Sequence, residues 1–261
     1  MRIVMIGAGN LATQLACSLP AAGHEVVQVY SRSCESAELL AGRMGCEAVT
    51  ELAAVRPDAD VYVFAVKDSV LSQLVAALPQ CGDDSVLVHT AGSMPMDLFA
   101  SRSEHYGVFY PMQTFSKQRD VDFRQIPAFI ESSDAFSHDV LFALASSLCD
   151  RVVEMSTEDR RYLHLAAVWA CNFVNHCYDI TSEVLSSHGI PFDVMLPLID
   201  ETARKVHELT PKQAQTGPAV RYDTNVMDRH IALMAGEPQL QQLYKALSES
   251  IHNRFSNDRK Q

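Results

Sequence analysis

The chain has 261 residues, of which 48% are hydrophobic, and a formal net charge of -11. This composition supports a full hydrophobic core, in one large domain or two small ones. The negative charge argues against nucleic acids and anionic membranes as partners, and no apolar run approaches the roughly 20 residues that span a bilayer. Because the chain opens directly into an apolar strand pattern, we expect no signal peptide and a cytoplasmic location.

The cysteines and histidines form no metal-binding pattern. Seven cysteines are scattered along the chain without a C-x-x-C pair. An odd, scattered set is typical of reduced thiols in a cytosolic enzyme rather than of a disulfide framework. None of the ten histidines stands in an H-x-x-x-H pair. We therefore expect no metal site.

The first strand pattern, Ile3 to Ile6, leads into the turn Gly7-Ala8-Gly9-Asn10-Leu11-Ala12. In the G-x-G-x-x-G/A pattern the first glycine permits a tight turn, and the second lets the backbone approach a pyrophosphate. The helix that follows presents free N–H groups to the phosphates. A second apolar run at 26–30 completes a β-α-β unit. We expect Gly7, Gly9, Asn10 and Leu11 to bind a dinucleotide; the alternative is a glycine turn that binds nothing.

The second strand pattern ends at Ser31-Arg32-Ser33, where the adenosine ribose should lie. An NAD site would offer an acidic residue there to bond the ribose hydroxyls. A guanidinium between two hydroxyls instead suits a 2′-phosphate, since Arg binds phosphate through a forked, charge-assisted pair of bonds. The sequence therefore favours NADP(H), held by Ser31, Arg32 and Ser33. A solvated surface arginine near Glu35 is the alternative and would leave the cofactor choice open.

Further apolar runs continue to residue 155, at 48–49, 61–66, 86–89, 108–110, 128–130 and 152–153, with a helical pattern at 69–78. Continuous apolar strands that alternate with helices indicate a parallel sheet covered on both faces. We predict an α/β domain over residues 1–155, a Rossmann-type, doubly wound, mainly parallel sheet.

Polar groups follow several of these strands, at the edge where ligands bind in open α/β sheets. Ala65, Val66 and Lys67 should lie over the cofactor, although surface lysines are common. His89 and Gln113 are candidate substrate contacts. The alternatives are a polar strand terminus for His89 and an ordinary proline-containing turn around Gln113.

No strand pattern follows Met155, and we predict an all-helical domain over residues 156–261. A helical pattern of about thirty residues begins at a capping box at Ser156 and ends at His188, and others span 194–209, 225–234 and 240–255. His164, Val168, Asn172, Asn175 and Asp179 stand at spacings of three or four and should share a face. We expect His164 and Asn172 to be catalytic, since histidine delivers protons near neutral pH, and Asn175 to contact substrate. The alternative is a packing or dimer network.

A polar loop later in the chain contains Arg221 and Asp223, and His230 follows it. Loops with such residues often contact ligands. We expect all three to contact substrate, with Arg221 opposite a carboxylate. Asp223 could equally cap a helix.

These segments together give a family resemblance. The chain resembles a bacterial family of Rossmann-like proteins whose helical C-terminal domain is of unknown function. The matching segments are Gly7 to Ala12, His89 to Ser93, Tyr110 to Phe115, His164 to Asn172, and Thr216 to Asp223. The chain is more distantly similar to pyrroline-5-carboxylate reductase, ketopantoate reductase, the hydroxyisobutyrate dehydrogenases and deazaflavin-dependent NADP oxidoreductases.

The resemblance implies an NADP-linked oxidoreductase whose helical domain completes the cleft, often across a homodimer. Hydroxyacid members of the wider group carry a catalytic lysine four residues before an asparagine on the long helix. Here Val168 and Cys171 stand four residues before Asn172 and Asn175. Oxidation of 3-hydroxyacids is therefore doubtful.

We accordingly predict an enzyme that transfers a hydride between NADP(H) and a small carbonyl or imine substrate. The alternative is an NADP-binding protein without turnover, such as a redox sensor or a partner subunit. The missing lysine favours the alternative, and the polar groups of the helical domain favour the enzyme.

Overall fold

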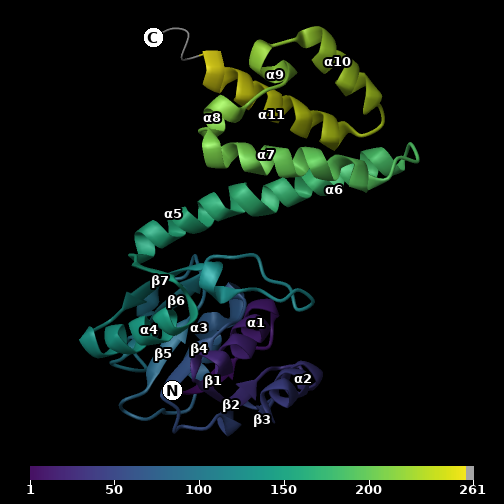
Figure 1. The fold of residues 1–261 in the computed structure, drawn as a ribbon. Helices are drawn as coiled ribbons and strands as arrows, with labels where there is room; N and C mark the ends of the chain where they lie inside the picture. Colours follow the sequence, from purple (N-terminus) through teal and green to yellow (C-terminus); the bar gives the residue numbers. More distant parts are fainter. Residues whose placement is uncertain (257–261) are drawn as a thin grey trace. The chain divides into compact units, whose positions relative to one another are not determined.

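The computed structural model describes residues 1–256, and its contacts divide the chain into two compact units, Met1–Cys177 and Tyr178–Gln261. The first unit is built on one eight-stranded sheet in the order β3-β2-β1-β4-β5-β6-β7-β8 (Figure 1). Neighbouring strands are parallel except for the β6–β7 pair, which is antiparallel. The strands are β1 Arg2–Ile6, β2 Glu25–Tyr30, β3 Glu47–Val49, β4 Val61–Phe64, β5 Val86–His89, β6 Tyr106–Pro111, β7 Pro127–Ser132 and β8 Arg151–Glu154. The predicted Rossmann-type, doubly wound sheet is confirmed.

Helices cover both faces of this sheet. They are α1 Asn10–Ser18, α2 Cys34–Met44, α3 Asp68–Ala77 and α4 Ala135–Leu148, joined in places by short 3-10 turns. Successive residues of β1 point to opposite faces, so Met5 packs with residues of α1, α2 and α4, whereas Ile6 packs with residues of α3. Because both faces are buried, the strands appear in the sequence as continuous apolar runs.

The long helical pattern after residue 155 is not one regular α-helix. It consists of α5 Thr157–Ala167, a π-helical turn at Val168–Asn172 and α6 Phe173–Ser186. The predicted start is confirmed, since the Ser156 hydroxyl accepts a hydrogen bond from the Asp159 N–H at 3.1 Å. The π-helical turn inserts one extra residue into the hydrogen-bonding ladder. Residues beyond it therefore face about 100° away from the direction that the 3.6-residue period predicts.

A buried ion pair attaches α5 to the sheet. Arg160 is 1% exposed, and its guanidinium donates to the Glu131 carboxylate on β7 and to the Met94 carbonyl oxygen at 2.6 Å. The same carboxylate accepts from the backbone N–H of Thr157 at 2.8 Å and from its hydroxyl at 2.7 Å. The first turn of α5 is therefore attached to the sheet, and the first contact unit extends to Cys177.

The second unit is helical. It contains the end of α6 and then α7 Leu196–Glu208, α8 Pro211–Ala214, α9 Pro218–Arg221, α10 Thr224–Leu233 and α11 Pro238–Ser256. The short helix α9 packs against both α10 and α11. Within residues 1–256, no helix is long and apolar enough to cross a bilayer.

Replacement of Arg160 should destabilise the fold strongly. We expect Arg160→Ala to lower the free energy of unfolding by about 3–5 kcal/mol, because it leaves the Glu131 carboxylate largely buried without its cation. The matched control is Arg161→Ala, because Arg161 is exposed and donates to the Ser93 carbonyl oxygen at 3.1 Å. Its removal should cost less than about 1.5 kcal/mol. Urea unfolding of the two variants measures the difference, and equal losses would contradict the role given to the ion pair.

Candidate functional site

The glycine turn after β1 is shaped for close approach. Gly7 has a φ of +122°, and a Cβ there would overlap the carbonyl oxygen of Ala65. Its N–H donates to the Tyr30 carbonyl oxygen at 2.8 Å, which closes the turn against β2. A Cβ on Gly9 would meet nothing within 4 Å, and no side chain caps α1. The start of α1 therefore faces open space, as a pyrophosphate site requires.

A cavity of about 720 Å³ lies over this turn, at the carboxyl ends of the strands. It brings together nine of the predicted cofactor residues: Gly7, Gly9, Asn10, Leu11, Ser31, Arg32, Ala65, Val66 and Lys67. Ser33 is not in the lining. Its hydroxyl instead caps α2 by accepting a hydrogen bond from the Ser36 N–H at 3.3 Å.

The charges in this cavity oppose those of the whole chain. Its lining includes the cations Arg32, Lys67 and Lys117 and a single carboxylate, Asp68, which accepts a hydrogen bond from the Ser93 hydroxyl. In a chain of net charge -11 this is a local positive site, which suits the phosphates of a dinucleotide.

Lys117 was missed by sequence analysis because it lies in an irregular loop with no motif. The loop is held over α1 by side chains of that helix. The Asn10 amide donates to the Phe115 carbonyl oxygen at 3.0 Å, and the Gln14 amide donates to the Ser116 carbonyl oxygen at 2.8 Å. The predicted phosphate contact Asn10 thus also positions a lysine at the cavity.

At one side of the cavity, Tyr110 of β6 meets His164 of α5. The Tyr110 Oη lies 3.1 Å from the His164 Nδ1, and the rings meet edge to face with centroids 6.1 Å apart. A Cβ on Gly92 would lie only 2.6 Å from the same Nδ1. The absence of a side chain at residue 92 therefore allows the imidazole to lie against the turn after β5.

A second cavity, of about 510 Å³, shares Tyr110 and His164 with the first. Its wall is mostly apolar and includes the predicted residues Gln113 and Asn172. Asn175 is exposed and is not among the residues of this wall. A π-helical turn lies between His164 and Asn175, and the expectation that Asn175 contacts substrate stays a prediction.

His89 lies beneath the cavity and not in its wall. It is 0% exposed, and both ring nitrogens are bonded within its own turn: Nδ1 accepts from the Ala91 N–H at 3.1 Å, and Nε2 donates to the Pro95 carbonyl oxygen at 3.3 Å. Burial, reinforced by the charge of Arg160, lowers the pKa of His89 to about 4. His89 is therefore a neutral structural residue here and does not reach the position predicted for a substrate contact.

Three predicted substrate residues belong to the second unit. Arg221 is the exposed last residue of α9, and the His230 Nδ1 lies 2.8 Å from the Tyr244 hydroxyl oxygen. Asp223 caps α10 by accepting a hydrogen bond from the Val226 N–H at 3.3 Å. For Asp223 the structure thus shows the helix cap, which was the alternative to a substrate contact in the sequence analysis.

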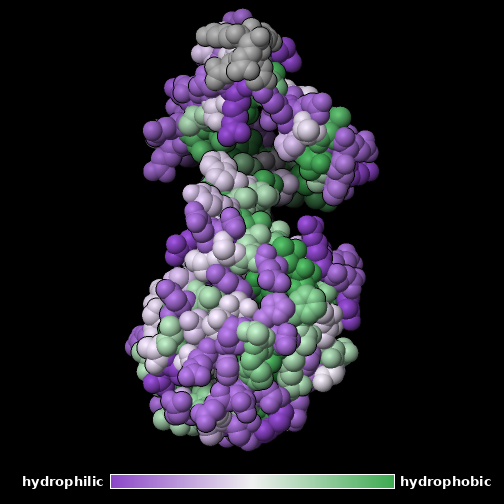
Figure 2. Space-filling view, turned by 90° about the vertical axis from the view of Figure 1, so that its left-hand side faces the viewer, coloured by the Kyte–Doolittle hydropathy of each residue, from purple (hydrophilic) through white to green (hydrophobic). Residues whose placement is uncertain are grey.

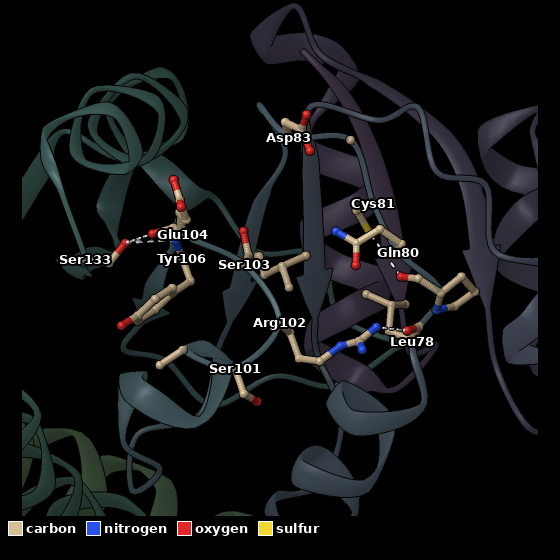
Figure 3. Close-up of a pocket in the computed structure, with 14 residues that line it drawn as sticks. Leu78, Gln80, Cys81, Asp83, Ser101, Arg102, Ser103, Glu104, Tyr106 and Ser133 are labelled. Carbon is tan, nitrogen blue, oxygen red and sulfur yellow. Dashed lines mark hydrogen bonds between the residues drawn. The ribbon is translucent and has the colours of Figure 1, made fainter.

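A larger cavity, of about 860 Å³, lies at the opposite end of the sheet, near the starts of β5 and β6 (Figure 3). The Arg102 guanidinium in its wall donates to the Leu78 carbonyl oxygen, while its Nε is buried without a partner. Asp83 and Glu104 also line this cavity. Its lining does not include the turn from Gly7 to Ala12, and it lies at the edge opposite the ligand-binding edge of open α/β sheets. We assign the site to the two smaller cavities.

The described residues contain no cluster of His, Cys, Asp and Glu that could hold a metal ion.

Two family descriptions match the chain. Residues 2–92 match the NADP oxidoreductases described as coenzyme F420-dependent, and residues 126–251 match a domain of unknown function, DUF2520. Among proteins with curated descriptions, none matches this chain in sequence.

Solved structures are similar over almost the whole chain. A protein from Bacteroides fragilis, provisionally named an NADP oxidoreductase, is 53% identical over 97% of this chain and 98% of its own, with a TM-score of 0.91. A protein from Thermotoga maritima is 20% identical over 98% and 99%, with a TM-score of 0.70. A reductive aminase from Aspergillus terreus, in complex with NADPH and ethyl-5-oxohexanoate, is 14% identical over 94% and 92%, with a TM-score of 0.67.

The fold and the cationic cavity over the glycine turn define a Rossmann-type dinucleotide-binding protein. The likeness to the Bacteroides protein, together with the two matched domains, is more specific. The chain belongs to the family of NADP oxidoreductases that join a Rossmann domain to a DUF2520 domain.

Proposed function

We propose that the protein is an NADPH-dependent reductase of a small carbonyl or imine substrate. The observation that carries this proposal is the pair Tyr110–His164, which forms a wall of both the cationic cavity and the apolar one. A dinucleotide in the first cavity and a substrate in the second would meet at these two side chains. Pockets with apolar walls and a few convergent polar groups are typical of small-molecule sites.

The residues of the first cavity fit NADP(H). Gly7 and Gly9 leave room for the pyrophosphate at the start of α1. Arg32, with Ser31, would hold the 2′-phosphate, while Lys67 and Lys117 add positive charge. When bound, the reduced nicotinamide supplies the hydride.

The residues of the second cavity would bind and orient the substrate. His164 and Asn172 offer polar groups to the reacting oxygen or nitrogen, and Gln113 offers a further amide. Val168 and Cys171 also line this wall, at the positions where hydroxyacid dehydrogenases of the wider group would carry lysine. The substrate class we propose is therefore a ketone, aldehyde or imine rather than a hydroxyacid.

Exposed apolar side chains on the second unit support a homodimer. Leu198, Val206 and Leu209 are 58%, 50% and 43% exposed and lie on one face of α7 and its end. Hydrophobic side chains at the surface are visible in both units (Figure 2). Exposed apolar patches mark association sites, and we propose that a second copy of the chain covers these three side chains.

A reducing, cytoplasmic location is also part of the proposal. The seven cysteines are odd in number and scattered, without a C-x-x-C pair. Such a set is typical of reduced thiols in a cytosolic enzyme rather than of a disulfide framework.

The reaction is tested by mixing the protein with NADPH and a panel of cyclohexanone, cyclohexanone with methylamine, 2-methyl-1-pyrroline and pyruvate. We expect consumption of NADPH with at least one of the neutral ketone or imine probes. His164→Ala should lower kcat by about 100-fold, as loss of a group acting in proton transfer does. Tight NADPH binding without turnover on any probe would instead support an NADP-binding protein without enzymatic activity.

The cofactor assignment depends on Arg32. We expect Arg32→Ala to raise the Kd for NADPH by about 10- to 100-fold, the value of a charge-assisted bond, and to leave the Kd for NADH almost unchanged. Arg43→Ala is the control, because Arg43 is exposed on α2 and lies outside the cavity lining. Fluorescence titration measures all three proteins. Equal losses for the two nucleotides would contradict the assignment of the 2′-phosphate to Arg32.

The dimer is tested by light scattering after gel filtration. We expect the mass of two chains for the wild type and of one chain for the double variant Leu198→Glu, Val206→Glu, because two carboxylates cannot be buried unpaired in an apolar interface. Leu39→Glu is the control, since Leu39 is a 56% exposed residue of the first unit. A monomeric wild type at micromolar concentration would contradict the proposal.

A further inference from the structure

The hydroxyl of Tyr110 is held in place by the sheet. Tyr110 lies next to the last residue of β6 and pairs with Phe129 of β7, and the two rings are 6.4 Å apart. The ring is partly buried, yet the residue lines both cavities. A strand fixes a side chain more rigidly than a loop does, which is what a reacting group requires.

The hydroxyl also has a built connection to a second proton-carrying group. His164 Nδ1 lies 3.1 Å from the Tyr110 Oη, within hydrogen-bond distance. The turn at Gly92 packs directly against the imidazole, so the ring has little room to move away from Tyr110. His164 lines both cavities as well, so the pair spans the region where they join.

The charges around Tyr110 suit a group that gives up a proton. Burial raises its pKa, while the positive charge of the buried Arg160 acts in the opposite direction. That cation would stabilise a tyrosinate as it forms. Arg160 is paired with Glu131 and does not line the first cavity. The charged side chains that line it are Arg32, Lys67, Lys117 and Asp68.

We propose that Tyr110 is the proton donor of the reduction and that His164, through Nδ1–H, returns the proton to it. This inference rests on the proposed function. As the substrate carbon accepts a hydride from the reduced nicotinamide, the π electron pair of C=O or C=N moves to the oxygen or nitrogen. That atom takes the phenolic proton, so the Tyr110 O–H bond breaks as the new O–H or N–H bond forms. The tyrosinate then takes the proton from Nδ1 as Nε2 gains one from solvent, so the ring stays neutral and only its tautomer changes.

Other side chains of the cavity wall are poorer donors. The amides of Asn172 and Gln113 bind but do not release protons at neutral pH. Within the described residues that line the second cavity, no lysine or carboxylic acid is present. Besides the Cys171 thiol, Tyr110 and His164 are the groups of that wall suited to proton transfer. The phenol combines a fixed position on a strand with a nearby cation that stabilises its ionised form.

The test compares Tyr110→Phe with Tyr106→Phe. Phenylalanine keeps the ring and removes only the hydroxyl. Tyr106 is a matched control because it stands on the same strand but lines the 860 Å³ cavity at the opposite end of the sheet (Figure 3). We expect Tyr110→Phe to leave the Kd for NADPH within about twofold of wild type. Its kcat on the panel probe that wild type reduces should fall by about 100-fold or more. Tyr106→Phe should change neither.

A second readout needs no turnover. The ¹⁵N signals of the His164 ring are assigned by their loss in His164→Gln. In the wild type we expect their chemical shifts to show a neutral ring protonated on Nδ1, and we expect these shifts to change in Tyr110→Phe. Retention of kcat in Tyr110→Phe, or a His164 ring protonated only on Nε2, would overturn the donor assignment while leaving the reductase intact. A wild type that reduces no probe would overturn the proposed function, and with it the reaction in which Tyr110 is placed.

Discussion

The ion pair between Arg160 and Glu131 positions the candidate site, because it attaches the first turn of α5 to the sheet. Glu131 pairs with Val108 of β6, two residues before Tyr110. From Val108 to Tyr110 the strand advances about 6.6 Å, and from Arg160 to His164 the helix advances about 6 Å. Because the two lengths are nearly equal, the imidazole lies beside the Tyr110 hydroxyl. The same cation lowers the pKa of His89 and opposes the effect of burial on Tyr110, so one charge acts on both the structure and the electrostatics of the site.

The parts of the molecule that sequence could predict are those defined by short, local patterns. The strands and the glycine turn depend on neighbouring residues, and Arg32 follows directly from the end of β2. Lys117 and the pairing of Tyr110 with His164 could not be predicted in this way. Lys117 depends on a loop fixed by α1 side chains, and the pair depends on the position of a helix far away in sequence.

Two further differences have definite physical causes. The helical period predicted that Asn175 would join His164 and Asn172, but a π-helical turn changes the phase of the helix between them. Such turns are rare and are found most often at functional sites, and the residue pattern does not predict this one. His89 stands at the expected strand end, but its two ring nitrogens bond to its own turn. Spacing alone cannot distinguish a histidine that faces a cavity from one that lies beneath it.

The contact between Gly92 and His164 has an evolutionary consequence. A methyl group at residue 92 would need the space that the imidazole occupies, so the imidazole could stay only by moving, and movement would stretch its bond to Tyr110. The turn after β5, the end of β6 and α5 are thus coupled through a residue without a side chain. A change at any of the three is tolerated only with a compensating change at another. In a lineage that keeps this chemistry, residue 92 should be substituted less often than its exposed neighbours.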